Sequence, residues 1–526
     1  MPSINFIKNA LISVADKTDI LKISNILIKN QISLFSTGGT AKVLKKNNIP
    51  VIEISDYTKF PEIMDGRVKT LHPKIMAGIL RRENKDEEIM QLYEISPIDI
   101  VIVNFYPFQK EINIKNNDID NIINNIDIGG PTLIRASAKN YKNVIVIVDL
   151  SDVQHIIDSI NNNTMNIKKR FYLATKAFEY TANYERIISQ YFIKKNNIKK
   201  NDFKNLFPKE INFSFTKKQD LRYGENQHQK ASFYIEQNIM QSGTISSAKQ
   251  IQGKNLSYNN ISDANTALEC VKEFNKPACV IVKHENPCGV AVNSSLAESY
   301  LSAYYADPIS AFGGIVAFNS VLDENTAKNI TKTKQFIEVI IAPEINISAL
   351  KILKNKPNIR ILITGKIKKN KISIDFKRIT NGLLVQEYDS HNIDLETWSY
   401  VTKRIPTKSE LEDAIFCWKV AKFVKSNAIV YGHNQVTISI GAGQMSRIYS
   451  TKLANIKIKD QGKNTIGATM ASDAFFPFRD GIDSAALVGI NCIVQPGGSI
   501  RDKEIIQAAN EKNMTMIFTN KRHFRH

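Results

Sequence analysis

The stretch CVIVKHENPCGVAV, residues 279–292, consists of two apolar runs on either side of a polar centre. Val280–Val282 is β-branched and Gly289–Val292 is apolar again, so each run predicts a strand. The centre, Lys283–Cys288, is titratable, polar or turn-forming. Three interpretations of a strand that ends in a cation, an imidazole and a thiol compete: a zinc site, a thiol nucleophile, or a Lys–His pair that transfers a proton.

The spacing in this stretch argues against zinc. Zinc deaminases combine H-x-E with a later P-C-x-x-C, whereas here His, Glu, Pro and Cys fall within five residues and the chain contains no C-x-x-C. The remaining cysteines offer no zinc spacing either. A nucleophilic Cys288 needs a base and an orienting group, and a small buried cysteine is the simpler interpretation. The five cysteines are Cys270, Cys279, Cys288, Cys417 and Cys492.

Length and composition predict a globular protein with several domains. The 526 residues suggest two to four domains, and 43% hydrophobic with 23% charged residues is a globular composition. No apolar run approaches the roughly 18 residues of a membrane span, and the N-terminus lacks the blocks of a signal peptide. An odd number of widely spaced cysteines favours a reducing compartment. We therefore expect a cytoplasmic protein with no membrane partner.

The formal net charge of +19 raises the question of nucleic-acid binding. Lys, Asn and Ile are abundant along the whole chain, however, and no helix-turn-helix, zinc finger or RNA-binding aromatic motif accompanies the charge. A basic chain also suits small polyanionic substrates. We expect no nucleic-acid partner.

The pattern of apolar runs predicts an α/β fold in two parts. In about the first 150 residues, short strands alternate with polar helices, which is typical of a parallel sheet. A helix is expected over 169–192, and a polar linker near 195–215. A longer α/β region follows, in which residues 279–292 and 425–443 look loosely alike, as in an internal duplication. The expected strands of the first part are 10–15, 32–36, 50–55, 99–106 and 143–149.

Two glycine-rich turns in the first part are candidates for anion binding. STGGTAKVLKKN places Thr37–Thr40 before a helix, where backbone N–H groups and the helix dipole favour an anion; an ordinary turn with a threonine cap is the alternative. A second turn has Asp127 before Gly129–Gly130, with Pro131 expected at the first helical position. Arg135 and Lys139 lie four apart on that helix and share a face.

Other polar groups are expected at the same edge of the sheet. Arg67 and Lys69 alternate, so in an extended segment they point the same way. Asn104 and Tyr106 end a strand, and ligands bind beyond the carboxyl ends of such strands. The cations and turns together predict a phosphate-bearing ligand.

The motifs LISVADKT, STGGTAKVL, GRVKTLHPKIMAGIL, NFYPF and DIGGPTLIRASAKN, in order from residue 11 to about 145, resemble one half of a bifunctional purine-biosynthesis family. That family joins a formyltransferase acting on 5-aminoimidazole-4-carboxamide ribonucleotide (AICAR) to inosine monophosphate (IMP) cyclohydrolase. The resemblance implies a methylglyoxal-synthase-like domain and a catalytic group of Lys69, Tyr106, Asp127 and Lys139. The implied substrate contacts are Ser13, Lys17, Thr37, Gly39, Thr40, Arg67, Lys69, Thr70, Asn104, Gly129 and Gly130.

Ring closure by the cyclohydrolase adds an amide nitrogen to a formyl carbon and then loses water. An amide is a poor nucleophile, so a base and a stabilised oxyanion both help. In this view Asp127 takes the amide proton, and the lysines and Tyr106 stabilise the oxygen.

The motifs DLRYGENQHQ, IQGKNLSYNNISDANTAL, KHENPCG, ADPISAFGG, EVIIAP, KSNAI, GAGQMSRI, SDAFFPFRDGID and TNKRHFRH resemble the AICAR formyltransferase half over residues 219–526. The resemblance implies two cytidine-deaminase-like subdomains without zinc. His284 with Lys283 would deprotonate the AICAR amine, and Asn427 would hold the formyl group. The implied nucleotide contacts are Arg222, Tyr223, Asn260, Gly313, Glu338 and Arg447. The implied folate contacts are Ile448, Phe475, Ser499, Ile500 and Arg522.

Three positions depart from the family pattern. Asp19 replaces a usual glycine, from which we expect a local change of turn. Glu338 stands where some relatives have aspartate, and Gln227 replaces a common proline, which leaves the rigidity of that loop open.

The resemblance as a whole predicts a cytoplasmic homodimer with a cyclohydrolase domain at 1–205 and a formyltransferase domain at 206–526. Its co-substrate would be 10-formyltetrahydrofolate, with no zinc; a monovalent cation is left open. One alternative is a cyclohydrolase with a decayed second half, which the intact KRHFRH terminus argues against. The other is a nucleotide-binding protein without catalysis. The latter predicts loss of Tyr106, Lys139 or His284, and all three are present.

Overall fold

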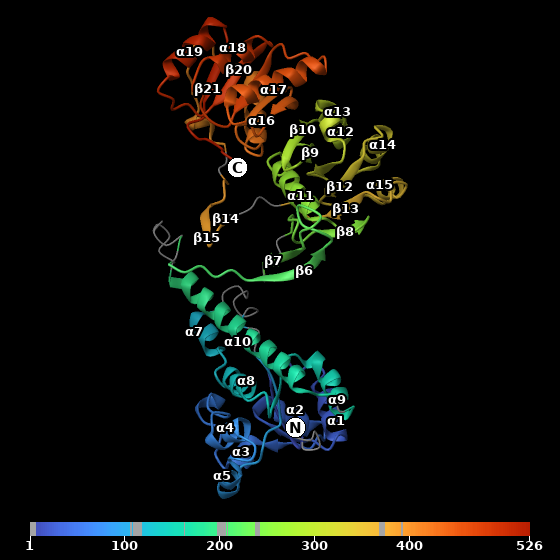
Figure 1. The fold of residues 1–526 in the computed structure, drawn as a ribbon, viewed down its shortest axis with the longest axis vertical. Coiled ribbons are helices and arrows are strands. Elements are labelled where there is room, and N and C mark those ends of the chain that lie inside the picture. The colour runs from blue at the N-terminus through green and yellow to red at the C-terminus, as the bar shows by residue number, and fades with distance from the viewer. Residues whose placement is uncertain are drawn as a thin grey trace. The chain divides into compact units, whose positions relative to one another are not determined.

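The computed structural model describes residues 7–105, 108, 118–162, 164–196, 207, 209–236, 242–367, 374–390 and 393–526. The chain forms two compact units, Met1–Ile211 and Asn212–His526 (Figure 1). No helix among these described residues is long and apolar enough to cross a membrane.

Unit 1 contains a parallel sheet of five strands in the order β3-β2-β1-β4-β5. The five strands expected from the sequence are thereby confirmed. The chain first adds strands on one side of β1 and then on the other, so β1 and β4 are neighbours at which the direction of winding reverses. Ligands bind at such a reversal, beyond the carboxyl ends of the strands. The strands are β1 Asn9–Val14, β2 Ser33–Ser36, β3 Ile52–Glu53, β4 Ile100–Asn104 and β5 Ile145–Ile147.

The helices of unit 1 pack on this sheet through one apolar core. Leu11, Val101 and Ile145 are fully buried in it, and each such side chain contributes about 1.5–3 kcal/mol. The helix expected at 169–192 is confirmed as the longer α10, which packs against α8 and β5. The helices are α1 Ile20–Lys29, α2 Gly38–Lys46, α3 Ile54–Thr58, η2 Met64–Gly66, α4 Pro73–Leu80, α5 Glu87–Leu92, α7 Ile119–Asn124, α8 Gly129–Lys139, η3 Leu150–Asp152, α9 Val153–Asn161 and α10 Ile167–Asn196.

Unit 2 is built on one mixed sheet of 12 strands, in the order β16-β21-β20-β19-β17-β18-β10-β9-β11-β12-β13-β8. The two apolar runs of residues 279–292 are its strands β9 and β10. The strands are β8 Lys249–Gln252, β9 Ala278–Lys283, β10 Asn286–Val292, β11 Gly314–Phe318, β12 Ile337–Ala342, β13 Arg360–Ile363, β16 Ser399–Tyr400, β17 Ile429–His433, β18 Val436–Gly441, β19 Ala468–Ser472, β20 Ile490–Gln495 and β21 Thr515–Phe518. Two separate hairpins are β6 Phe215–Leu221 with β7 Ala231–Glu236, and β14 Ile374–Ile379 with β15 Gly382–Glu387.

The strand order of unit 2 reads the same outward from its centre. From β10 the chain order of neighbours is β9, β11, β12 and β13, and from β18 it is β17, β19, β20 and β21. The central contact is an antiparallel bridge between Ala291 and Val436. The internal duplication suggested by the sequence is therefore confirmed in the topology.

The helices repeat the same order in the two halves of unit 2. Helix α11 Tyr258–Val271 precedes β9 as α16 Lys408–Ala421 precedes β17. Both begin with a capping box, Ser257 with Asn260 and Thr407 with Glu410. The other helices are α12 Leu296–Ala306, α13 Pro308–Ala311, α14 Glu324–Lys332 and α15 Ile347–Leu353 in the first half, and α17 Arg447–Asp460, α18 Asp480–Ala486 and α19 Asp502–Glu511 in the second; η5 Leu395–Thr397 precedes β16.

Candidate active sites

Asn104 ends β4 and joins it to the loop after β1, where the winding of the unit 1 sheet reverses. Its Oδ1 accepts from the N–H of Ala15 at 2.7 Å and of Asp16 at 3.0 Å, and its Nδ2 donates to the Asp16 carbonyl at 3.2 Å. Ser13 lies in β1 immediately before this loop. The predicted position of Asn104 at the carboxyl edge is thus confirmed, and its amide shapes the loop that leads to Lys17.

The first glycine-rich turn opens α2, as the sequence predicts. Thr37 is its N-cap, without a side-chain cap hydrogen bond, and a Cβ built on Gly39 would lie 3.7 Å from Lys17 Nζ. Thr40 is buried, and its hydroxyl donates to the Val14 carbonyl at 3.1 Å, so it fastens the helix to β1. The turn therefore presents backbone N–H groups and a lysine at the carboxyl edge.

Glu62 is a site residue that the sequence reasoning missed. Its Oε1 accepts from the Gly38 N–H at 3.1 Å, so a carboxylate lies at the N-terminus of α2. A Cβ built on Gly38 would lie 3.3 Å from Lys69 Nζ and 3.7 Å from Glu62 Oε1. Nothing in the sequence pairs Glu62 with the glycine-rich turn, because a lone glutamate in DYTKFPEIMDG carries little information by itself.

Asp127 lies beside the second glycine-rich turn, at the start of α8. Its Oδ1 accepts from the Gly130 N–H at 2.8 Å, and the Tyr184 hydroxyl accepts from the Asp127 N–H at 2.8 Å. Burial raises the pKa of the Asp127 carboxyl, against the lowering effect of the Gly130 N–H and of the Lys69 charge. A more basic carboxylate suits the abstraction of a proton.

Both glycines of this turn are required by close packing. A Cβ on Gly130 would lie 2.6 Å from Asp127 Oδ2, and one on Gly129 would lie 2.7 Å from Thr70 Oγ1. Thr70 itself is buried. Unit 1 therefore brings Lys69, Thr70, Asp127 and the two glycines together.

Two expectations for unit 1 were wrong in their local geometry. The segment with Arg67 is not an extended strand: η2 Met64–Gly66 precedes it and Arg67 has a helical backbone, because Gly66 with φ +80° permits a tight turn. Arg67 is exposed and donates to Asn124 Oδ1 at 2.8 Å. Pro131 is the third residue of α8 and not its first, because the helix already begins at Gly129.

Lys139 is the last residue of α8, whereas Asp127 lies just before its start. Ten residues of rise separate Lys139 from Gly129, which is about 15 Å. The structure therefore does not bring Lys139 together with Asp127, and its role stays a prediction from the resemblance. Tyr106 lies outside the described residues.

Asp19 has φ +60° and is the N-cap of α1. A left-handed backbone is easy for the glycine of the family pattern but is less favourable for aspartate. Asp19 thus adopts the backbone that suits glycine, and the expected local change of turn stays a prediction.

The predicted residues of unit 2 lie along one edge of the large sheet. Strands β9 and β17 are antiparallel to their neighbours β11 and β19, while β11 and β12, and β19 to β21, run parallel to each other. The end of β9, the starts of β11, β12 and β17, and the ends of β19, β20 and β21 therefore share an edge. Glu338 is the second residue of β12. The residues that follow or precede these strand ends are His284, Gly313, Asn427, Phe475, Ser499, Ile500 and Arg522.

Lys283 ends β9 at this edge, and His284 follows it. Lys283 Nζ donates to the Phe312 carbonyl at 2.5 Å, next to Gly313, and Gly313 has φ +73°. His284 and Glu285 form the turn to β10. This arrangement holds the lysine ammonium and the imidazole at one strand end.

Lys425 connects this turn to the second half of the sheet. Its Nζ lies 2.9 Å from Glu285 Oε2, and its N–H donates to Asn286 Oδ1 at 2.8 Å. Two residues further, Asn427 Oδ1 accepts from Arg447 Nη2 at 2.9 Å. The residues implied for proton transfer and for the formyl group thus lie on two connected loops.

Arg447 is a buried cation at the start of α17. It pairs with Asp473 and donates to Ser472 Oγ at 2.7 Å. Ile448 follows it and is half-buried. Its guanidinium is already paired within the chain, so Arg447 shapes this edge, and its contact with the nucleotide stays a prediction from the resemblance.

Glu338 is likewise paired, with Arg360 at 2.6 Å. Asn260 is buried and forms the capping box of α11. Arg222 lies over the ring of Tyr223 at 5.5 Å, and the loop with Gln227 is closed by the Gly224 N–H, which donates to the Gln229 carbonyl at 2.7 Å.

The implied folate contacts are more exposed. Phe475 is 42% exposed and Ile500 fully exposed, while Arg522 lies over Phe524 at 4.7 Å. They follow the carboxyl ends of three adjacent parallel strands, where ligands bind in open sheets.

Cys288 has the environment of a packing residue. Burial raises the pKa of its thiol to about 12, so the thiol is protonated near neutral pH and a poor nucleophile. Within the described ranges, no three His, Cys, Asp or Glu side chains gather as a metal site.

Comparison with protein families assigns both parts of the chain. The model of the AICARFT/IMPCHase bienzyme family matches residues 137–457, more than half of the chain, and that of the MGS-like domain matches residues 19–132. The chain belongs to the AICARFT/IMPCHase bienzyme family. Its N-terminal domain is MGS-like, as expected.

Proteins from two subspecies of Buchnera aphidicola are similar over the full length. The "Bifunctional purine biosynthesis protein PurH" of Buchnera aphidicola subsp. Acyrthosiphon pisum (strain 5A) is 74% identical over 526 residues, 100% of both chains. That of Buchnera aphidicola subsp. Schizaphis graminum (strain Sg) is 69% identical over 523 residues, 99% of both. A solved structure described as "Crystal structure of ForH" matches with 29% identity and a TM-score of 0.32, covering 35% of this chain and 98% of that chain.

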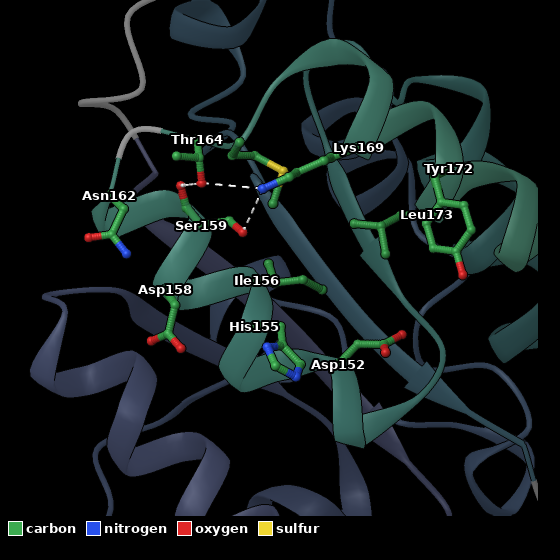
Figure 2. Close-up of a pocket in the computed structure, with 11 residues that line it drawn as sticks. Asp152, His155, Ile156, Asp158, Ser159, Asn162, Thr164, Lys169, Tyr172 and Leu173 are labelled. Atoms are coloured by element: carbon green, nitrogen blue, oxygen red, sulfur yellow. Dashed lines mark hydrogen bonds between the residues drawn. The ribbon is translucent and has the colours of Figure 1, made fainter.

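The bienzyme also has a cavity of about 420 Å³ between α9 and the start of α10. Figure 2 shows Ile156 and Leu173 at its wall and the hydrogen bonds from Lys169 Nζ to the hydroxyls of Ser159 and Thr164. The cavity is lined by Asp152, His155, Ile156, Asp158, Ser159, Asn162, Thr164, Met165, Lys169, Tyr172 and Leu173. None of these is a residue that the family motifs assign to either reaction.

Proposed function

We propose that the chain catalyses two consecutive reactions of purine biosynthesis, one in each unit. The amine of AICAR takes the formyl group of 10-formyltetrahydrofolate, which releases tetrahydrofolate. The carboxamide nitrogen of formyl-AICAR then closes the ring with loss of water to give IMP. The observation that carries this proposal is that the two sets of family motifs lie at two separate sheet edges, one in unit 1 and one in unit 2.

Formyl transfer is assigned to the edge of unit 2 that carries His284. As the AICAR amine attacks the formyl carbon, His284 takes its proton, the bond from that carbon to the folate nitrogen breaks, and this nitrogen is protonated. Lys283 precedes His284 and is assigned to assist it, and the Asn427 amide, whose Nδ2 also donates to the Gln444 carbonyl at 2.8 Å, is assigned to the formyl oxygen as charge develops. A general base typically contributes about 10²–10⁴-fold in rate.

Ring closure is assigned to the reversal of the unit 1 sheet. The glycine turn at α2 and Lys17 are suited to the phosphate. Asp127, whose pKa is raised by burial, takes a proton from the carboxamide, and Lys69 stabilises the oxygen that leaves as water. Tyr106 and Lys139 are assigned to this reaction by resemblance only.

A homodimer is the proposed working form for formyl transfer. From β9, which carries His284, β20 is five strands away and β21 six, or about 24 and 29 Å at 4.8 Å per strand. The folate contacts Ser499, Ile500 and Arg522 follow these distant strands. A formyl group must pass directly between bound molecules, so we propose that the folate residues of one chain serve the nucleotide residues of another.

The terminal segment argues against the alternative of a decayed second half. His523 is buried and its N–H donates to the Asp473 carbonyl at 3.1 Å. Arg525 donates to Thr266 Oγ1 at 2.8 Å and to the Phe423 carbonyl at 2.9 Å. A segment with these specific contacts is part of the folded unit. A cytoplasmic location and the use of 10-formyltetrahydrofolate without zinc belong to this proposal; a monovalent cation is left open.

Two single-site variants test the assignment of one reaction to each unit. Asp127→Asn should release tetrahydrofolate from AICAR and 10-formyltetrahydrofolate at the wild-type rate but accumulate formyl-AICAR. His284→Ala should convert supplied formyl-AICAR to IMP but form little tetrahydrofolate. Loss of both activities in either folded variant would contradict two separate sites.

A further inference from the structure

Each half of the unit 2 sheet contains a hairpin whose two turn residues have left-handed backbones. His284 and Glu285, with φ of 51° and 60°, connect β9 to β10. Asn434 and Gln435, with φ of 50° and 56°, connect β17 to β18. Turns with two such residues favour Asn-Gly, but neither turn contains glycine. Unfavourable backbones of this kind persist only where the surrounding structure fixes them.

An aspartate from a helix supports each turn in the same way. Asp263 of α11 accepts from the Glu285 N–H at 2.7 Å through Oδ1. The N–H groups of Glu285 and His284 both act to lower the pKa of this carboxyl, against the raising effect of burial. In the second half, Asp413 of α16 accepts from the Asn434 N–H at 3.0 Å and from the Gln435 N–H at 2.8 Å. Both halves of the duplicated sheet therefore contain an aspartate that accepts from the backbone of the turn.

The two turns differ in the side chain that they carry. The first turn residue is His284 in one half and Asn434 in the other. The imidazole nearest to the second turn is that of His433, which ends β17 and has its Nδ1 3.4 Å from Asp413 Oδ2. The aspartate binds the turn backbone in both halves, which makes its role independent of the side chain above it. In the first half, however, the hydrogen bond from the Glu285 N–H to Asp263 fixes the turn, and the turn sets the direction in which the His284 side chain leaves the backbone.

We propose that Asp263 is a positioning residue for formyl transfer, which holds His284 in place through the backbone of its turn. This inference rests on the proposed function, because it requires His284 to act as the base. In Asp263→Asn the side chain has one acceptor oxygen fewer, so the turn can relax and the imidazole moves. A displacement of about 1 Å in a catalytic group can lower the rate about 10²-fold.

The test compares Asp263→Asn with Asp413→Asn, a matched change at the turn formed by Asn434 and Gln435, which has no role in the proposed reaction. Asp263→Asn should lower the kcat of formyl transfer about 10- to 100-fold and leave the KM for AICAR within about twofold. Asp413→Asn should lower the melting temperature to a similar extent but keep kcat. Unchanged kcat in Asp263→Asn, or equal loss of kcat in both variants, would overturn the positioning role.

Hydrogen exchange in the wild-type protein provides a test that needs no substitution. The amide of Glu285 should exchange slowly although it lies in a turn, because it donates to Asp263. Rapid exchange would overturn the proposal even if Asp263→Asn does not fold.

His284→Ala separates this inference from the proposed function. If His284→Ala retains formyl transfer, the assignment of the base is wrong, and the positioning role is wrong with it. If His284→Ala is inactive and Asp263→Asn is fully active, only the positioning role is wrong.

Discussion

Lys425 Nζ lies 2.9 Å from Glu285 Oε2, and this ion pair joins the loop before β17 to the turn that carries His284. The same loop carries Asn427, which accepts from Arg447. The two halves of a duplicated sheet thus meet at the residues proposed to act on the AICAR amine and on the formyl group.

Loss of this ion pair should affect formyl transfer more than stability. Both side chains are more than one third exposed, so Lys425→Met should change the melting temperature little. The two loops would be held together less firmly, and we expect about a three- to tenfold lower kcat for formyl transfer. Lys328→Met, which removes a surface pair with Glu324 in the same unit, should leave kcat unchanged. Equal effects of the two variants would contradict this role of Lys425.

Cys288 should be dispensable although it lies four residues from His284. Its thiol is buried, with a pKa raised to about 12, and is therefore protonated under assay conditions. We expect Cys288→Ala to keep formyl transfer and to lose some stability through the cavity left behind. Steady-state kinetics at neutral pH together with a thermal melt decide the point. Inactivation of folded Cys288→Ala would return the thiol to the mechanism.

Cyclohydrolase activity should decline on the acidic side at a higher pH than for an ordinary aspartate. Burial raises the pKa of Asp127 above its usual 3.8, and the base must be deprotonated, so activity is lost as pH falls through this raised pKa. Protonation of a buried carboxyl with a raised pKa favours the folded state, so this group does not cause unfolding there.

Lys69→Met provides the matched test of that pH profile. The Lys69 charge lowers the pKa of Asp127, so its removal should move the acidic limb to still higher pH, besides reducing the rate. An acidic limb that stays in place in Lys69→Met would show that another group limits the activity.

Dilution should separate the two activities. If folate and nucleotide residues come from different chains, specific formyltransferase activity falls as dimers dissociate. Cyclohydrolase activity should stay constant, because its assigned residues lie at one edge of a single sheet. Sedimentation at the same concentrations reports the fraction of dimer, and undiminished formyl transfer by a demonstrated monomer would contradict the shared site.

The sequence predicts the strands of this chain better than its local backbone. The apolar runs around Leu11, Val101 and Val280 identify strands because such β-branched and aliphatic runs bury well in sheets. The alternation of Arg67 and Lys69 predicts an extended segment, but Gly66 permits a tight turn and Arg67 has a helical backbone.

The sequence predicts which residues belong to the candidate sites, but not which of them lie close together. Glycine-rich turns and the Lys–His pair are visible in the sequence because their chemistry is local. The separation of Lys139 from Asp127 depends on where α8 begins, and the carboxylate of Glu62 at α2 depends on a contact over 24 residues of sequence. The likeness of residues 279–292 and 425–443 only suggests a duplication, whereas the order of the strands in the unit 2 sheet shows it.

An assay of the purified wild-type chain with AICAR and 10-formyltetrahydrofolate tests the central claim most directly, when tetrahydrofolate and IMP are followed together. Two working sites in one chain predict that both products form and reach equal amounts. A chain that converts supplied formyl-AICAR to IMP but releases no tetrahydrofolate from AICAR and 10-formyltetrahydrofolate, at concentrations where it is dimeric, would contradict the account.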